Sequence, residues 1–310
     1  MRELADDDQN ILDVYSMFSG DTASVCEAEV IEDFCRGRNL SHVESGCFPG
    51  GSRGTVWLDD RVSIPSLEGR GDTRQYDNPL TATGLMRALN RMRFHHETLP
   101  DAARRLIYIS DLPPSCILAL TATASTHQVP VLRNSIYKHL TSKISIAVKI
   151  PSIGFLTFQL DLHLPYFLLK KSHPPKDAFP EINPKSRTKW IDLSFLMMDA
   201  SESHSQELKE VWGVHEVQIS CVVTGSDDWR WVAYGFVDNE IDGSQTDLNE
   251  YEMCIDRIAA GQLVADVPIW RPRDYWLTVF KIRIKEVRGA WEYLIHKVEL
   301  SANQYVCWLT

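Results

Sequence analysis

Apolar and polar residues alternate along two stretches in the second half of the chain. In residues 215–224 every second residue from Val217 to Val223 is apolar. After the polar turn Gly225–Asp228, two sets of residues alternate along the return strand: Trp229, Trp231, Ala233 and Gly235 against Arg230, Val232, Tyr234 and Phe236. A strand points successive side chains to opposite faces, and two alternating runs joined by a short polar turn are typical of a β-hairpin. We therefore expect these two segments to pair antiparallel.

The same alternation makes the longest apolar stretch of the chain a strand. Residues 150–169 contain one formally charged residue, Asp161, and are long enough for a membrane-spanning helix. Apolar side chains, however, occupy every second position from Leu156 to Leu164, with polar residues between them, which indicates a strand with one buried face. Residues 144–150 predict the other strand of a second hairpin, and we expect no membrane span in this chain.

Helices are predicted between and after these strands. Helix signals cover four segments, residues 80–94, 113–125, 130–140 and 247–261. A further strand is expected at residues 105–110. Because strands and helices mix without regular βαβ repeats, the sequence predicts an α+β fold with a mixed or antiparallel sheet, packed helices and a long C-terminal helix.

The C-terminal helix is expected to be unusually long. From Pro272 to about Tyr305, apolar residues recur at steps of three, four and seven. A helix of about 34 residues is about 50 Å long, so its second half should project beyond the domain. Four apolar side chains of that half should be partly exposed: Leu294, Val298, Tyr305 and Trp308. Such a stripe predicts self-association or binding of a protein partner through this helix.

Negative charge is concentrated at the N-terminus. The formal net charge is −10, and residues 1–33 hold ten acidic residues against one basic residue. The rest of the chain is therefore near neutral, which argues against nucleic acid as a partner. High charge with few periodic apolar residues predicts that residues 1–33 are disordered. We expect an acidic, loosely structured region over residues 1–100 and an α+β domain over residues 101–310.

Cysteine usage and the first residues suggest a compartment. The chain has seven cysteines with no regular disulfide framework and no spacing typical of a zinc site. Its first residues lack the basic and apolar segments of a secretory signal. We therefore expect reduced thiols and a soluble, cytoplasmic protein.

One short acidic motif resembles the start of a calcium-binding loop. Asp238, Glu240 and Asp242 place carboxylates at its first, third and fifth positions, and Gly243 follows. Calcium prefers such hard oxygen ligands, and the glycine permits a sharp turn. The twelfth position is Asn249 instead of glutamate, and a strand precedes the motif instead of a helix. A solvated acidic turn is therefore the competing interpretation.

Two further pairs of residues have the chemistry of a site. Asp161 and His163 share one strand face, as a metal or acid–base pair requires, but we interpret that face as exposed to solvent. Cys116 and His127 can form a nucleophile–base pair only if folding brings them together. A buried structural cysteine is the competing interpretation for Cys116.

Residues 104–305 resemble an uncharacterised fungal protein family. The resemblance rests on the segments Arg104–Leu112, Ile117–Leu120, Val148–Pro151, Gly154–Leu160, Leu164–Phe167, Val217–Gly225, Asp228–Tyr234, Pro268–Trp270 and Pro272–Tyr275. Many members continue into a helical region with membrane spans that is similar to CorA-type divalent-cation transporters. The resemblance implies a soluble domain that ends in a stalk-like helix, and it supplies no catalytic residue.

These observations favour a non-catalytic interaction or regulatory domain of the CorA-like family. The chain ends at Thr310 without a membrane span or a Gly-Met-Asn pore signature, so we expect no transport by this chain alone. Two alternatives stay open. One is an enzyme or accessory protein of a fungal metabolic pathway, possessing a site that the sequence does not reveal. The other is a truncated transporter remnant without transport activity.

Overall fold

The alternating residues after position 210 form a hairpin at the centre of a sheet. In the computed structural model, β7 (Val211–Gly225) and β8 (Trp231–Val237) pair antiparallel, with Cys221 opposite Gly235. Cys221 and its alternate neighbours face one side of the sheet, whereas Phe236 and its alternate neighbours face the other. The predicted hairpin is therefore confirmed.

The hairpin belongs to one eight-stranded mixed sheet. β3 (Arg104–Ser110) lies parallel to β8, β1 (Val56–Val62) pairs antiparallel with β3, and β2 (Asp72–Thr73) extends that side. The structure describes residues 22–48, 50–63, 71–150, 157–172, 190–196, 211–238 and 268–309.

The second predicted hairpin forms the opposite side of the sheet. β5 (Phe158–Ser172) pairs antiparallel with β7 along its whole length, and β4 (Ser145–Lys149) pairs antiparallel with β5 at the edge. The short β6 (Trp190–Asp192) pairs with the beginning of β7. The strand order is β2-β1-β3-β8-β7-β5-β4.

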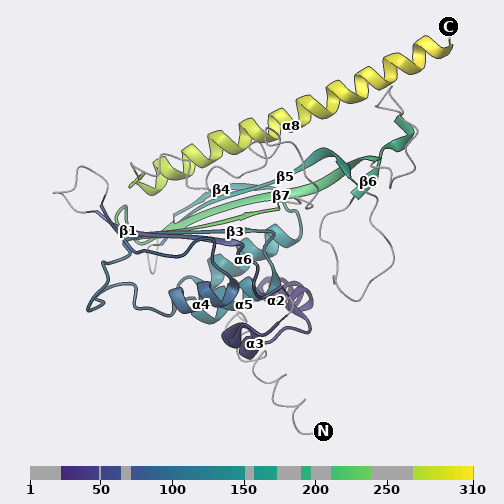
Figure 1. Cartoon of the computed structure of the whole chain (residues 1–310). Coiled ribbons are helices and arrows are strands. Elements are labelled where there is room, and N and C mark those ends of the chain that lie inside the picture. Colours follow the sequence, from purple (N-terminus) through teal and green to yellow (C-terminus); the bar gives the residue numbers. More distant parts are fainter. Residues whose placement is uncertain are drawn as a thin grey trace, which may run out of the picture.

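Helices cover both faces of the sheet (Figure 1). Among the described helices, α8 (Pro272–Leu309) is the one that crosses one face, along the direction of β5 and β7. The other face carries five helices, α2 (Thr22–Cys35), α3 (Leu40–Ser45), α4 (Ala82–Leu89), α5 (Pro114–Thr123) and α6 (Val129–Leu140). Each face has its own apolar core. The α+β class, the mixed sheet and the long C-terminal helix are thus confirmed.

Part of the segment that was expected to be disordered forms helix α2 from Thr22 onward, and the division of the chain at residue 100 stays a prediction. Ile31 of α2 is fully buried in the core with the other helices. Glu27 of the same helix accepts hydrogen bonds from Arg133 (3.0 Å) and Asn134 (2.7 Å) of α6. Glu27 therefore links α2 to α6, a helix that lies far along the chain. Residues 1–21 and the predicted helix 247–261 lie outside the described residues.

The second half of α8 does not project freely, which corrects a further expectation. α8 has 38 residues and is about 57 Å long. β5 and β7 have 15 residues each and span about 50 Å, so they accompany the helix. Trp291 meets the ring of Phe167 on β5, and Ser301 donates a hydrogen bond to the carbonyl of Leu196 in the short 3-10 helix η1 (Ser194–Leu196).

Candidate functional site

The polar face of β5 is buried, which corrects its interpretation as a solvent-facing surface. Asp161 and His163 are both inaccessible to solvent because α6 covers them. Lys138 of α6 donates a hydrogen bond to Asp161 Oδ2 at 3.0 Å, and Gln159 donates to Oδ1 at 2.6 Å. The carboxylate is thereby neutralised within the fold and does not present a ligand to solvent.

His163 is part of a chain of buried polar groups centred on Ser220 of β7. The Ser220 hydroxyl lies 2.9 Å from Nδ1 of His139 and 2.8 Å from Nδ1 of His163. Nε2 of His139 faces Asp238 Oδ1 at 3.4 Å. All four side chains are buried between α6 and the sheet.

The Ser220 hydroxyl can donate to one of the two histidine nitrogens and accept from the other, and the tautomers of the two rings decide which. Burial, followed by the positive charge of Lys138, lowers the pKa of His163 to about 2, so His163 is neutral.

The connectivity Ser220–His139–Asp238 is that of a serine, histidine and aspartate catalytic relay. Catalysis also requires that a substrate reach the serine oxygen. Ser220 is inaccessible to solvent, and its hydroxyl already lies within hydrogen-bond distance of both His139 and His163. The group therefore stabilises the contact between α6 and the sheet, and the described structure offers no substrate route to it.

The acidic motif after β8 is only partly described. Asp238 Oδ2 accepts a hydrogen bond from the backbone N–H of Gln218 at 2.8 Å, and its Oδ1 faces His139. Both oxygens thus point into the fold. Glu240 and Asp242 lie outside the described residues, and within the described ranges no group of three or more metal-ligating side chains converges. The calcium loop therefore stays a prediction.

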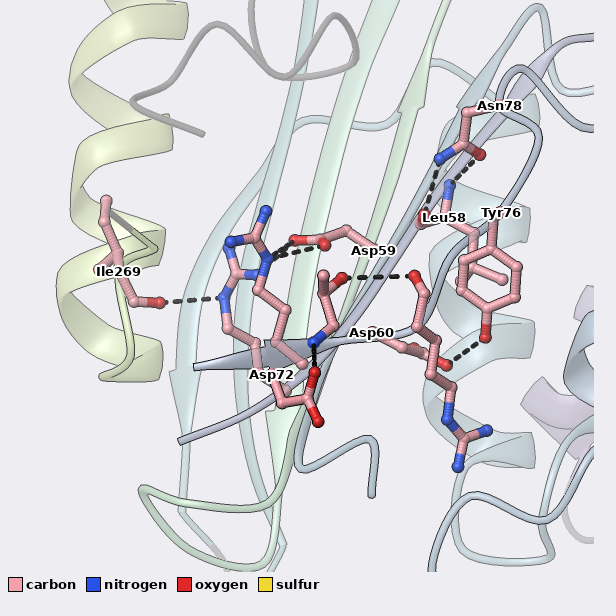
Figure 2. Close-up of polar contacts among 11 residues, drawn as sticks. Leu58, Asp59, Asp60, Asp72, Tyr76, Asn78 and Ile269 are labelled. Atoms are coloured by element: carbon pink, nitrogen blue, oxygen red, sulfur yellow. Dashed lines mark hydrogen bonds and ion pairs between the residues drawn. The ribbon is translucent and has the colours of Figure 1, made fainter. Parts of the chain in front are cut away.

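A second buried network joins β1 to β3. Arg105 donates two hydrogen bonds of 2.7 Å to the two oxygens of Asp60, and Tyr76 donates a third of 2.7 Å to Oδ2. Figure 2 shows Tyr76 pointing at Asp60, and Asn78 nearby bonded to the backbone of Leu58 through both its amide atoms. This bidentate pair is satisfied and buried, as in a structural ion pair.

A parallel set of contacts on the other face ties the segment before α8 to the sheet. Arg104 contacts Asp59 at 2.6 Å and donates to the carbonyl of Ile269 at 3.0 Å (Figure 2). Its guanidinium also lies over the rings of Trp231 and Tyr275. Arg104 and Arg105 thus fix opposite faces of the same strand.

A small cavity lies between α8 and the sheet. It is lined by Tyr108, Cys221, Gly235 and Arg283, among others, and has a volume of about 10 Å³. That is the space of about one water molecule, too small for a substrate. Arg283 donates a hydrogen bond to the Tyr108 hydroxyl beside it.

The remaining candidate thiol is buried. Cys116 lies inside α5, and burial raises the pKa of its thiol to about 12. Its sulfur contacts the Thr55 hydroxyl at 3.8 Å, not His127, whose backbone lies between α5 and α6. A thiol with so high a pKa is a poor nucleophile, so the structural interpretation of Cys116 holds.

One face of α8 is apolar and exposed. Five apolar residues at steps of seven, seven, four and three share this face, with 36% to 59% of each residue accessible: Leu277, Ile284, Trp291, Ile295 and Val298. We call them the α8 outer face. Of the predicted exposed residues, Val298 and Tyr305 are exposed and Leu294 is half-buried. The side chain of Trp308 lies outside the description.

The α8 outer face is directed toward the β4 edge of the sheet. Trp291 lies against Phe167 of β5, whereas Lys297, on the opposite side of α8, lies over Trp212 of β7. β4 lies beside β5 at the edge of the sheet. Exposed apolar residues, 52% to 74% accessible, occupy every second position within β4 and directly beside its two ends: Ile144, Ile146, Val148 and Ile150. We call them the β4 row.

The β4 row lies on the same side of the sheet as α8. Ile146 pairs with Leu162 and Val148 pairs with Leu160, and both leucines belong to the core beneath α8. Paired residues in a sheet point to the same face. The α8 outer face and the β4 row are therefore neighbouring apolar surfaces on one side of the protein.

Comparisons with known proteins add no family. No family model, curated protein or solved structure matches the chain. The resemblance to the CorA-like fungal family therefore stays a prediction. Among the described helices, none combines the length and the hydropathy that crossing a membrane requires.

Sequence reasoning identified the residues of β5 but missed their partners. The partners are His139 and Ser220, and no local sequence pattern around them indicates that α6 covers β5 and β7. Asp60 and Arg105 are charged residues within strands, and such residues are rarely buried unless paired. Charges inside otherwise apolar strands were the available signal for that network.

Proposed function

We propose that this chain is a non-catalytic interaction module that associates with a second copy of itself through the α8 outer face. The observation that carries the proposal is the regular apolar row on α8. A helix buries one apolar stripe on its own domain, and α8 does so on the core side with Tyr275, Trp276 and Val279. Its second stripe remains exposed, which is typical of an interaction surface.

The β4 row is a second reason to place the contact on this side of the protein. An exposed apolar edge strand promotes unwanted association unless it is covered or charged. Lys149 is the charged residue within β4, and the four apolar side chains of the row stand on one face. A partner that covers the α8 outer face would shield part of this row as well.

The polar networks support a non-catalytic role. Ser220 and Asp60 have the chemistry of reactive groups, but both are buried and hydrogen-bonded within the fold. The proposal includes that this module is the soluble domain of the family that the sequence resembles, and that part rests on the sequence segments alone.

A double variant and a control variant on the same helix test the proposal. Ile295 and Leu300 are exposed aliphatic residues on one helix, 59% and 47% accessible, but Ile295 belongs to the α8 outer face and Leu300 lies on the other side. In sedimentation velocity, Ile295→Asp together with Ile284→Asp should weaken self-association at least about tenfold, because charges would enter an apolar contact. Leu300→Asp should associate like the wild type.

Leu294, which the sequence predicts to be exposed, is not a suitable site for this test. Leu294 is half-buried on the sheet side of α8, so an aspartate there would also disturb the domain. The proposal would be contradicted if the protein with Ile284→Asp and Ile295→Asp associated as strongly as the wild type. Circular dichroism should show that the helix content of this protein is unchanged.

A further inference from the structure

We infer that the two copies pair their α8 helices antiparallel, with a two-fold axis close to Ala290. This inference rests on the proposed function and specifies the geometry of the same surface. It follows from the order of charges along α8 and from the order of apolar residues on the α8 outer face, which independently give the same centre.

The charges beside the α8 outer face change sign near the middle of the helix. Lys281 and Arg288 precede Ala290, and Glu292 and Glu299 follow it. All four side chains lie along one flank, since each pair is separated by seven residues and Arg288 forms an i,i+4 ion pair with Glu292 at 3.2 Å. Lys285, one turn after Lys281, adds a further positive charge to the first half.

This order of charges distinguishes the two possible orientations. Parallel helices would place this flank beside the opposite flank of the second copy, so Lys281 and Arg288 would not meet the glutamates of their own flank. Antiparallel helices place Lys281 opposite Glu299 of the second copy and Arg288 opposite Glu292. Both of these pairs have their midpoint at position 290, so one two-fold axis forms all four contacts. Flanking charges set the orientation of paired helices in this way.

The apolar residues give the same register. With the axis near Ala290, Ile284 lies opposite Ile295 of the second copy, and Leu277 lies opposite Ala302, which is also exposed. The midpoint of each pair falls between positions 289 and 290. The two Trp291 side chains then meet at the centre. The paired span, from Leu277 to Ala302, is about 40 Å long.

Other charged groups of α8 do not oppose this arrangement. Glu286 lies in the basic half but forms an ion pair of 2.8 Å with Arg283 toward the sheet. Lys297 lies in the acidic half but is placed over the ring of Trp212. Asp274 stands in the first turn of the helix, outside the paired span.

Charge reversal tests the register in the full chain. One variant carries Lys281→Glu with Arg288→Glu, and a second carries Glu292→Lys with Glu299→Lys. Each variant alone should self-associate about tenfold more weakly than the wild type or worse at low ionic strength, because every cross-pair becomes repulsive. An equimolar mixture should regain wild-type affinity as a heterodimer, and the variant with all four changes should regain it as a homodimer.

The outcomes separate this inference from the proposed function. The antiparallel register is wrong if the two charge variants associate like the wild type. It is also wrong if the variant with all four changes keeps its helix content but does not regain wild-type affinity. In that case the proposed function stands as long as Ile284→Asp with Ile295→Asp still weakens association. A wild type that stays monomeric at all concentrations overturns both.

Discussion

The absence of a side chain at Gly235 leaves the space that the Tyr108 ring occupies. The two residues lie opposite each other on β3 and β8, and a Cβ atom added to Gly235 would stand 2.5 Å from the Tyr108 ring. Glycine thus allows the ring to lie across β8, where its hydroxyl meets Arg283 of α8. Tyr108 therefore connects the packing of β3 on β8 to the position of α8.

Gly235→Ala should lower the free energy of unfolding by about 1–3 kcal/mol, because overpacking displaces a buried ring. The matched control is Gly289→Ala in α8, where no atom lies within 4 Å of the added Cβ. That change should stabilise the helix by about 0.5–1 kcal/mol. Urea denaturation measures both, and equal effects of the two alanines would contradict the close packing.

The buried His163 makes stability depend on pH. Its pKa is lowered to about 2 by burial and by Lys138, whereas an unfolded histidine titrates near 6.5. The unfolded chain therefore takes up a proton that the folded chain refuses as pH falls below about 6.5. Stability from this residue is fully present above that pH and falls by up to about 1.4 kcal/mol per pH unit below it.

His163→Gln should therefore make unfolding free energy less dependent on pH between about 4 and 6. Glutamine can still donate to Ser220 but does not titrate. Chemical denaturation at several pH values measures the slope, and His42→Gln on the exposed surface of α3 serves as the control. An unchanged slope in His163→Gln would show that His163 is protonated in the folded protein.

Among the elements, the pairing of β1 with β3 depends on the buried ion pair of Asp60 with Arg105. Asp60→Asn keeps the shape but leaves Arg105 buried with a weaker partner. We expect a loss of about 3–5 kcal/mol in unfolding free energy, the usual effect of breaking a buried pair. Asp33→Asn, which removes an exposed pair with Arg36, should change stability by less than about 0.5 kcal/mol. Comparable losses in the two variants would refute the structural role.

Local patterns predicted the elements whose partners are close in sequence. The β7–β8 and β4–β5 hairpins carry their signals in alternation and turn residues, and both are confirmed. The pairing of β1 with β3 and of β3 with β8 joins segments far apart in sequence. No local pattern specifies which distant strand is the neighbour.

The candidate site was less predictable for the same reason. Alternation correctly placed Asp161 and His163 on a polar face, but only the tertiary fold shows that α6 covers it. His139 of α6, to which the sequence drew no attention, is buried beside them. The exposed stripe of α8 was partly predicted, yet the accompanying strands β5 and β7 bury the side that includes Leu294.

At the scale of the molecule, the sheet is covered unequally. Among the described elements, five helices lie on one side of the sheet and α8 lies on the other (Figure 1). The β4 row is exposed beside the α8 outer face. A second α8 from another copy would widen the cover over this side, which is the physical reason for the proposed association.

The most direct test of that claim is sedimentation equilibrium of the wild-type chain over a wide range of concentrations. The apparent mass should rise from the monomer value of 35.4 kDa toward twice that value as concentration increases. Raising the salt concentration should weaken the association, since charge pairs orient the helices. A mass that stays at 35.4 kDa up to the highest soluble concentration would contradict the account.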